Sequence, residues 1–258
     1  MSPKGHILMM AGALFALAFA LPGRGMNPQA QALIEQGDAQ VRALNASAAL
    51  ALFEEAAKAD PNDAQILLRI SQQYSNMIAA AKTPAEALDD AHRSLEEAKQ
   101  AEALAPDNPK AHLAVAVAYG RLTDFVDDRT KVEYSRYVKS EADKTLELDP
   151  REDFAYHVLG RWNYSVATLN PVLKLIARFV YGGMPEASLE EAEHDFKKAI
   201  EIAPQRVIHH HELARVYVAE GRMDDARKEW QTELTLKPED NEGANDQKEA
   251  RAALEKSN

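Results

Sequence analysis

Five prolines spaced along the chain constrain the fold more than any other feature. Each follows a helix-like stretch and precedes another, at intervals of 45, 44, 54 and 34 residues: Pro61, Pro106, Pro150, Pro204 and Pro238. Proline ends a helix because it lacks the backbone N–H and restricts the residue before it. A unit that ends in the same way at each recurrence predicts a stack of repeated helix pairs.

Small and bulky residues recur twelve, eight and five positions before these prolines. The clearest triplets are Ala49, Phe53 and Ala56; Ala192, Phe196 and Ala199; and Ala226, Trp230 and Glu233. The two weaker triplets are Ser94, Ala98 and Ala101, and Val138, Ala142 and Thr145. A bulky residue between two small ones lets a neighbouring helix approach closely. With tyrosines thirteen residues after three of the prolines (Tyr74, Tyr119 and Tyr217), this pattern resembles the tetratricopeptide (TPR) consensus.

The pattern predicts an all-α fold, a TPR-like α-solenoid in which antiparallel helix pairs form a right-handed superhelix. The predicted helices cover 28–44 and 47–59, 63–81 and 85–104, 108–123 and 129–148, 152–168 and 188–202, and 206–220 and 222–236, with a closing helix at 243–256. Local signals agree, since 83–86 and 188–191 read as capping boxes and Gly221 suits a left-handed turn within the fifth pair.

The N-terminal residues predict a signal peptide. Lys4 precedes an apolar run from Ile7 to Leu21, and residues 18–20 fit a small-x-small cleavage site. The run is shorter than the ~20 residues that cross a bilayer, which favours a cleaved signal over an uncleaved membrane anchor. We therefore expect a protein that is exported, periplasmic or secreted. Its parts would be a signal peptide at 1–20, a linker at 21–27 and the repeat domain at 28–258.

Charge and composition exclude several classes of partner. The chain has 30 basic and 41 acidic residues and no cysteine. The absence of cysteine excludes disulfides, thiolate metal sites and cysteine nucleophiles. Because an acidic chain repels phosphates, we expect no nucleic acid partner, and an anionic ligand would need a local basic pocket.

Two matching His-x-x-x-Arg pairs are the candidate binding residues. They lie seven and eleven positions after their prolines, His157 with Arg161 and His211 with Arg215. In a TPR stack the first helices of successive pairs line the concave groove, so we expect a basic row there with Arg121 at its edge. Such donors would bind a carboxylate or phosphate. The alternative is that each arginine pairs with an acid of the neighbouring repeat.

Other histidine patterns predict no metal site. The rings of His209, His210 and His211 point about 100° apart on a helix and cannot converge on one ion. Glu191 and His194 form a single Glu-x-x-His, whereas di-iron bundles need two copies and further carboxylates. The sequence also has no phosphate-binding loop and no nucleophile elbow. We therefore expect neither a cofactor nor an enzyme.

The fourth pair contains an apolar insertion at 170–186. It includes Val172, Leu175 and Phe179 and is then broken by Gly182. We interpret it as a short amphipathic helix folded against the array. A lid over the groove and a lipid-contacting surface are the alternatives.

The later repeats resemble the regulator of microtubule dynamics family of TPR proteins, with coverage from about residue 106 onward. The matching segments are 157–164 (HVLGRWNY), the insertion up to 182, 189–192, 196–199 and 245–250 (NDQKEA). The resemblance implies a helical-repeat module without catalytic activity. It also implies eukaryotic relatives linked to microtubules, organelle contacts and lipid transfer.

These observations predict a non-catalytic scaffold whose concave groove holds a peptide or protein partner. The alternative is a carrier or tether that binds an anionic lipid, with the 170–186 segment as its lid. A peptide groove should be open and lined by polar groups, whereas a lipid site needs a continuous apolar cavity of roughly several hundred Å³.

Overall fold

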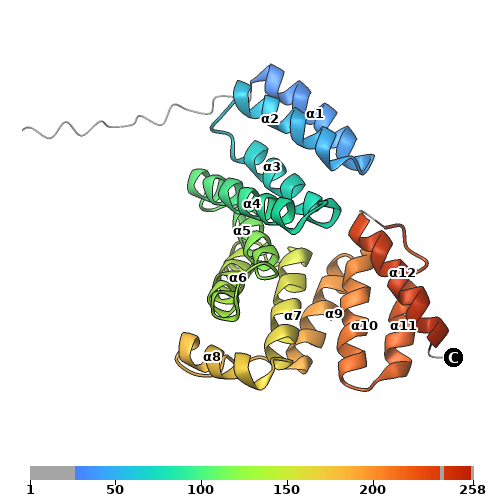
Figure 1. The fold of residues 1–258 in the computed structure, drawn as a ribbon. Coiled ribbons are helices and arrows are strands. Elements are labelled where there is room, and N and C mark those ends of the chain that lie inside the picture. Colours follow the sequence, from blue (N-terminus) through green and yellow to red (C-terminus); the bar gives the residue numbers. More distant parts are fainter. Residues whose placement is uncertain (1–26, 239–240, 257–258) are drawn as a thin grey trace, which may run out of the picture.

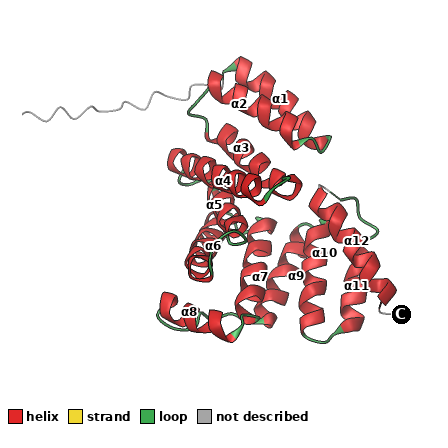
Figure 2. Cartoon of the chain, in the orientation of Figure 1, coloured by secondary structure: helices red, strands yellow, loops and turns green. Residues whose placement is uncertain are grey.

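The computed structural model describes residues 27–238 and 241–256, and within these ranges the regular elements are helices (Figures 1 and 2). The predicted signal peptide and most of the predicted linker lie outside the described residues. The α-helices are α1 (Pro28–Arg42), α2 (Ala46–Ala59), α3 (Ala64–Met77), α4 (Pro84–Leu104), α5 (Pro109–Leu122), α6 (Asp128–Leu148), α7 (Asp153–Ala167), α8 (Pro171–Tyr181), α9 (Leu189–Ile202), α10 (Val207–Ala219), α11 (Met223–Glu233) and α12 (Asn241–Lys256).

The helices pack as five consecutive pairs. The partners are α1 and α2, α3 and α4, α5 and α6, α7 and α9, and α10 and α11. Each pair contacts the next, and the first helices α3, α5, α7 and α10 also contact one another in series. Helix α12 packs on α10 and α11, and Figure 1 shows the pairs following a curved path from α1 to α12. The predicted TPR-like α-solenoid is confirmed.

All fifteen repeat positions that precede the prolines are buried, including those of the two weaker units. Phe53 and Phe196 have no exposed surface, and Trp230 is 7% exposed. Close packing against small residues accounts for this burial, because protein interiors leave few voids. The same repeat positions are therefore buried in every helix pair from the first unit to the last.

Polar caps begin the helices where the sequence predicts them. Thr83 Oγ1 accepts a hydrogen bond from the Glu86 backbone N–H at 3.2 Å, and Ser188 Oγ accepts one from the Glu191 N–H at 3.0 Å. These bonds satisfy donors that have no partner within the first turn. Gly221 has a φ of 76°, which gives the predicted left-handed turn between α10 and α11.

The apolar insertion forms α8, which packs against α6. Ala177 is buried in this contact, and the Tyr181 hydroxyl lies 2.7 Å from Ser135 Oγ. The opposite face is exposed and apolar, with Phe179 81% and Leu175 69% exposed. Among the described helices, none combines the length and the apolar character needed to span a bilayer.

Candidate functional site

A concave groove of about 740 Å³ lies along the first helices of the stack. Its walls come mainly from α1, α3, α5, α7 and α10, with Phe53 of α2 and Ser94 of α4. Many of the lining side chains are polar, among them Asp38, Gln65, Arg69, Gln72, Asn76 and Lys110. A groove of this kind can hydrogen-bond an elongated ligand along its length.

Three exposed amide side chains form a stripe on α3 within the groove. Gln65, Gln72 and Asn76 are separated by seven and four residues, so they lie on one helical face. Each amide carries both donors and an acceptor and can therefore pair with a peptide backbone in either sense. This stripe was not predicted from the sequence, although the heptad-like spacing of amides on a first helix was a usable signal.

Fixed charges occur along the same groove. The Arg69 guanidinium makes two bonds to the Asp38 carboxylate, Nε to Oδ1 at 3.0 Å and Nη2 to Oδ2 at 3.2 Å. Further along, Lys110 and Arg206 face Glu152, and burial together with the nearby Asp153 raises the pKa of Glu152. The groove therefore offers both signs of charge rather than one uniform basic row.

A second cavity, of about 480 Å³, lies between α5, α6, α7 and α8. Its lining is mostly apolar and includes Val132, Val138, Trp162, Leu173 and Ala177. Three basic side chains also line it: Arg121, Lys131 and Arg161. The cavity beneath the insertion therefore combines apolar walls with positive charge.

The groove and the cavity share part of their walls. Val117, Arg121, Phe154 and Ile208 line both. Of the five candidate residues, Arg121, His157 and Arg161 are thus brought together around the cavity beneath α8, whereas His211 and Arg215 line neither space.

The four predicted donors do not form one open row, because both histidines are buried with protein partners. His157 is 1% exposed, and its Nδ1 lies 3.1 Å from Nδ1 of His209. Burial, with the nearby charges of His209 and Arg161, holds the pKa of His157 well below its ordinary value. His211 is 7% exposed and contacts Glu233 at 3.4 Å. Burial opposes a charge there, but the bond to Glu233 raises the pKa of His211.

Arg161 and Arg215 converge on one acid, Glu212. The Arg161 Nε lies 3.6 Å from Glu212 Oε1, and the Arg215 Nη1 lies 2.8 Å from Glu212 Oε2. Arg161 thus pairs with an acid of the next repeat, as the alternative interpretation expected, while Arg215 pairs within its own helix. Arg215 also lies over the ring of Tyr164, with its guanidinium carbon 5.1 Å from the ring centroid.

The three consecutive histidines of α10 point to three different partners. His209 Nε2 contacts Asp153 at 2.9 Å, His210 Nδ1 contacts Glu229 at 2.7 Å, and His211 contacts Glu233. Their divergence follows from the 100° step of the helix. His209 thus joins α10 to α7, His210 and His211 join it to α11, and the three rings do not converge on one point.

The stacked helix pairs define the class of the protein: it is a TPR-type helical-repeat protein. Within this class, the chain belongs to the regulator of microtubule dynamics protein 1-3 family, whose sequence pattern matches residues 28–258. The resemblance noted in the sequence is thereby confirmed.

Individual relatives support the assignment. The chain is 29% identical to regulator of microtubule dynamics protein 2 of Homo sapiens over 143 residues, covering 55% of this chain and 35% of that protein. It is 28% identical to regulator of microtubule dynamics protein 3 of Rattus norvegicus over 167 residues, covering 63% of this chain and 35% of that protein. The chain thus matches about a third of the length of these relatives.

A solved structure shares the fold. A thermophilic TPR protein in Thermus thermophilus superposes with a TM-score of 0.65 at 19% identity. The match covers 87% of this chain and 98% of that one. This similarity establishes the architecture alone, because one fold can serve many functions.

Proposed function

We propose that the chain is a non-catalytic scaffold that holds an extended segment of a protein partner in the groove along α3, α5 and α7. The observation that carries this proposal is the amide stripe of Gln65, Gln72 and Asn76 on the wall of a groove of about 740 Å³. The side chains stand on rigid helices, so binding orders little of the scaffold and most of the entropy cost falls on the peptide.

Site-specific photocrosslinking tests this proposal. A photoreactive residue at Gln72 lies in the groove, whereas the same residue at Gln100 lies on α4, away from both the groove and the cavity. In the native host, we expect a defined protein adduct from position 72 and none from position 100. Equal adducts from both positions, or only lipid adducts from position 72, would contradict groove binding.

A second candidate function is supported by the cavity beneath α8. We propose that this cavity of about 480 Å³ accepts an acyl chain of an anionic lipid, with Arg121, Lys131 and Arg161 placed to pair with its head group. The volume is in the range of small-molecule pockets, and α8 covers the cavity as a lid would.

Two leucines of α8 provide a matched pair of variants for the lipid candidate. Leu173 lines the cavity, whereas Leu175 is 69% exposed and does not line it. Leu173→Arg should abolish binding of a fluorescent fatty acid to the purified chain, because an arginine in an apolar cavity is costly. Leu175→Arg should leave binding unchanged. Equal affinities of the two variants would refute the cavity as the lipid site.

We also propose export across a membrane, supported by the apolar run from Ile7 to Leu21 after Lys4. N-terminal sequencing of the protein recovered from its host should then begin near residue 21. An intact N-terminus would instead support the uncleaved anchor.

A further inference from the structure

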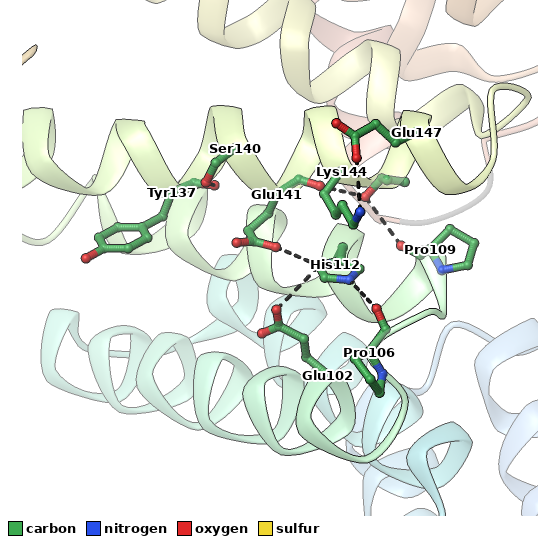
Figure 3. Close-up of polar contacts among 10 residues, drawn as sticks. Glu102, Pro106, Pro109, His112, Tyr137, Ser140, Glu141, Lys144 and Glu147 are labelled. Carbon is green, nitrogen blue, oxygen red and sulfur yellow. Dashed lines mark hydrogen bonds and ion pairs between the residues drawn. The ribbon is translucent and has the colours of Figure 1, made fainter.

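A histidine held between two carboxylates lies where α4, α5 and α6 meet, apart from both the groove and the cavity (Figure 3). His112 Nδ1 is 2.7 Å from Glu141 Oε2 and 3.4 Å from Glu102 Oε1. The His112 side chain is 8% exposed, and the two carboxylates remain partly accessible at 30% for Glu102 and 20% for Glu141.

The hydrogen bonds of His112 fix which of its nitrogens carries a proton. Its Nε2 lies 2.8 Å from the carbonyl oxygen of Pro106, and a carbonyl oxygen only accepts, so Nε2 carries the hydrogen. In a neutral imidazole, Nδ1 then presents a lone pair to the Glu141 carboxylate at 2.7 Å. Two lone pairs at that distance repel each other. A positive species, a proton or a metal ion, must therefore lie between them.

The chain contains a second copy of half of this arrangement. Counted from the repeat prolines, His210 and Glu229 occupy the positions of His112 and Glu141. Nδ1 of His210 is also 2.7 Å from the glutamate, and its Nε2 lies 3.0 Å from the Pro204 carbonyl oxygen. A histidine held between a proline carbonyl and one glutamate therefore occurs in two repeats. A single proton between Nδ1 and the glutamate satisfies this arrangement.

The third group distinguishes the two copies. Glu102 stands four residues before Pro106, and the matching residue before Pro204 is Ile200. One proton on Nδ1 of His112 is shared poorly between two carboxylates, because Glu141 takes it at 2.7 Å and Glu102 remains at 3.4 Å. A divalent cation, in contrast, neutralises both carboxylates together.

We propose that His112, Glu102 and Glu141 bind one divalent transition-metal ion of the zinc type. Their ligand atoms all lie within 4.8 Å of one another. Bonds of about 2.0–2.2 Å in a tetrahedral site separate ligand atoms by about 3.4 Å, which is the distance from His112 to Glu102. Glu141 needs to retreat by several tenths of an ångström, which a partly exposed glutamate can do.

The surroundings of His112 are those of a metal ligand. The Nε2–H bond to the Pro106 carbonyl leaves Nδ1 free to coordinate and orients the ring, which is the outer-shell contact common to metal-bound histidines. Water can complete the coordination from the accessible side of the glutamates. The ion would join the end of the second helix pair to both helices of the third and would act as a clamp between repeats.

The site is tested by titrating the purified full chain with Zn²⁺ and measuring the heat of binding by calorimetry. Co²⁺ serves as the spectroscopic probe in a second titration. We expect one equivalent of Zn²⁺ to bind and Co²⁺ to give the visible absorption of a tetrahedral ion. Glu102→Gln should weaken Zn²⁺ binding by at least about tenfold, since outer-shell changes alone reach that size. Glu229→Gln, which alters the one-carboxylate copy, should leave it unchanged.

Three results would overturn the proposal. They are no saturable Zn²⁺ binding to the wild-type chain, equal affinities of the wild type and Glu102→Gln, and an equal loss in Glu229→Gln. Both substitutions are at partly exposed side chains, and helix content and thermal midpoint measured without metal keep a folding defect apart from a loss of ligand.

Discussion

At the residue scale, a chain of three buried side chains connects α7 and α10. The Asp153 carboxylate accepts from Nε2 of His209 at 2.9 Å, which leaves Nδ1 of His209 as an acceptor. His157 therefore donates its Nδ1–H to His209 at 3.1 Å, and its own Nε2 carries no hydrogen. Consistent with this tautomer, the His157 Nε2 is buried without a hydrogen-bond partner among the described residues. The arrangement requires a neutral His157.

This neutral histidine predicts a destabilisation of the fold in acid. The pKa of His157 in the folded chain lies well below its ordinary value of about 6.5, because of burial and the charges of His209, Arg161, Arg121 and Arg206. Below about pH 6.5 the unfolded chain therefore binds a proton that the folded chain does not. His157→Gln removes this difference. Its cost in unfolding free energy relative to wild type should shrink by about 1.4 kcal/mol per pH unit below about pH 6.5 in urea titrations.

His210 provides the control, because its contribution to stability depends on pH in the opposite direction. Burial opposes its charge, but the hydrogen bonds to Glu229 and to the Pro204 carbonyl, together with the nearby carboxylate charges, outweigh burial and raise the pKa of His210. Its contribution to stability is fully present below about pH 6.5 and is lost as the pH rises through the folded pKa. The cost of His210→Gln should thus be larger at low pH than at high pH. The same pH trend in both variants would disprove this assignment of charges.

The candidate site was only partly predictable, and the reason lies at this scale. The offsets from the prolines correctly placed His157 and His211 on first helices, but they could not identify the buried partners of these rings. His209 lies 52 residues from His157, and Glu233 lies 22 residues from His211. Such pairings depend on how two repeats dock, and no local pattern encodes them.

At the scale of elements, the predicted helices agree closely with the observed ones because their end signals are local. Proline and the polar caps act within one turn. The predicted start at residue 85 therefore differs from the start of α4 at Pro84 by one residue, and the predicted end at residue 202 coincides with the end of α9 at Ile202. The last turn of the predicted helix 63–81 is instead a 3₁₀ turn at Ile78–Ala80. A 3₁₀ turn is common at the C-terminal end of an α-helix.

Close approach of α7 and α9 predicts a large effect from a single methyl group. A Cβ added at Gly160 would lie 2.9 Å from the Phe196 ring, which is itself fully buried and cannot move aside. Gly160→Ala should therefore lower the unfolding free energy by about 1–3 kcal/mol, the usual cost of overpacking. Gly120→Ala on α5 meets nothing within 4 Å and should stabilise the chain by up to about 1 kcal/mol. Thermal melts of the two variants that shift in the same direction would contradict this packing.

At the scale of the whole molecule, the core is divided along the array. One cluster joins α1, α2 and α3 around Phe53, a second runs from α4 to α7, and a third joins α9 to α12 around Phe196 and Trp230. Each helix pair contacts mainly its neighbours, so the energy of the fold is a sum of local terms. This division follows from the repeat, and it separates the groove wall on α3 from the C-terminal cluster.

Such a division predicts that damage to one cluster stays local. Phe53 and Phe196 occupy the same repeat position and are both fully buried, so their alanine variants form a matched pair. Each substitution should lower the local unfolding free energy by about 3–5 kcal/mol. In hydrogen exchange, Phe53→Ala should speed exchange in α1 to α3 and leave α10 to α12 protected, and Phe196→Ala should do the reverse. A single cooperative core would instead raise exchange along the whole chain in both variants. If the core were a single cooperative unit, either substitution would abolish partner binding in the groove. If the response is local, Phe53→Ala leaves the cavity beneath α8 intact.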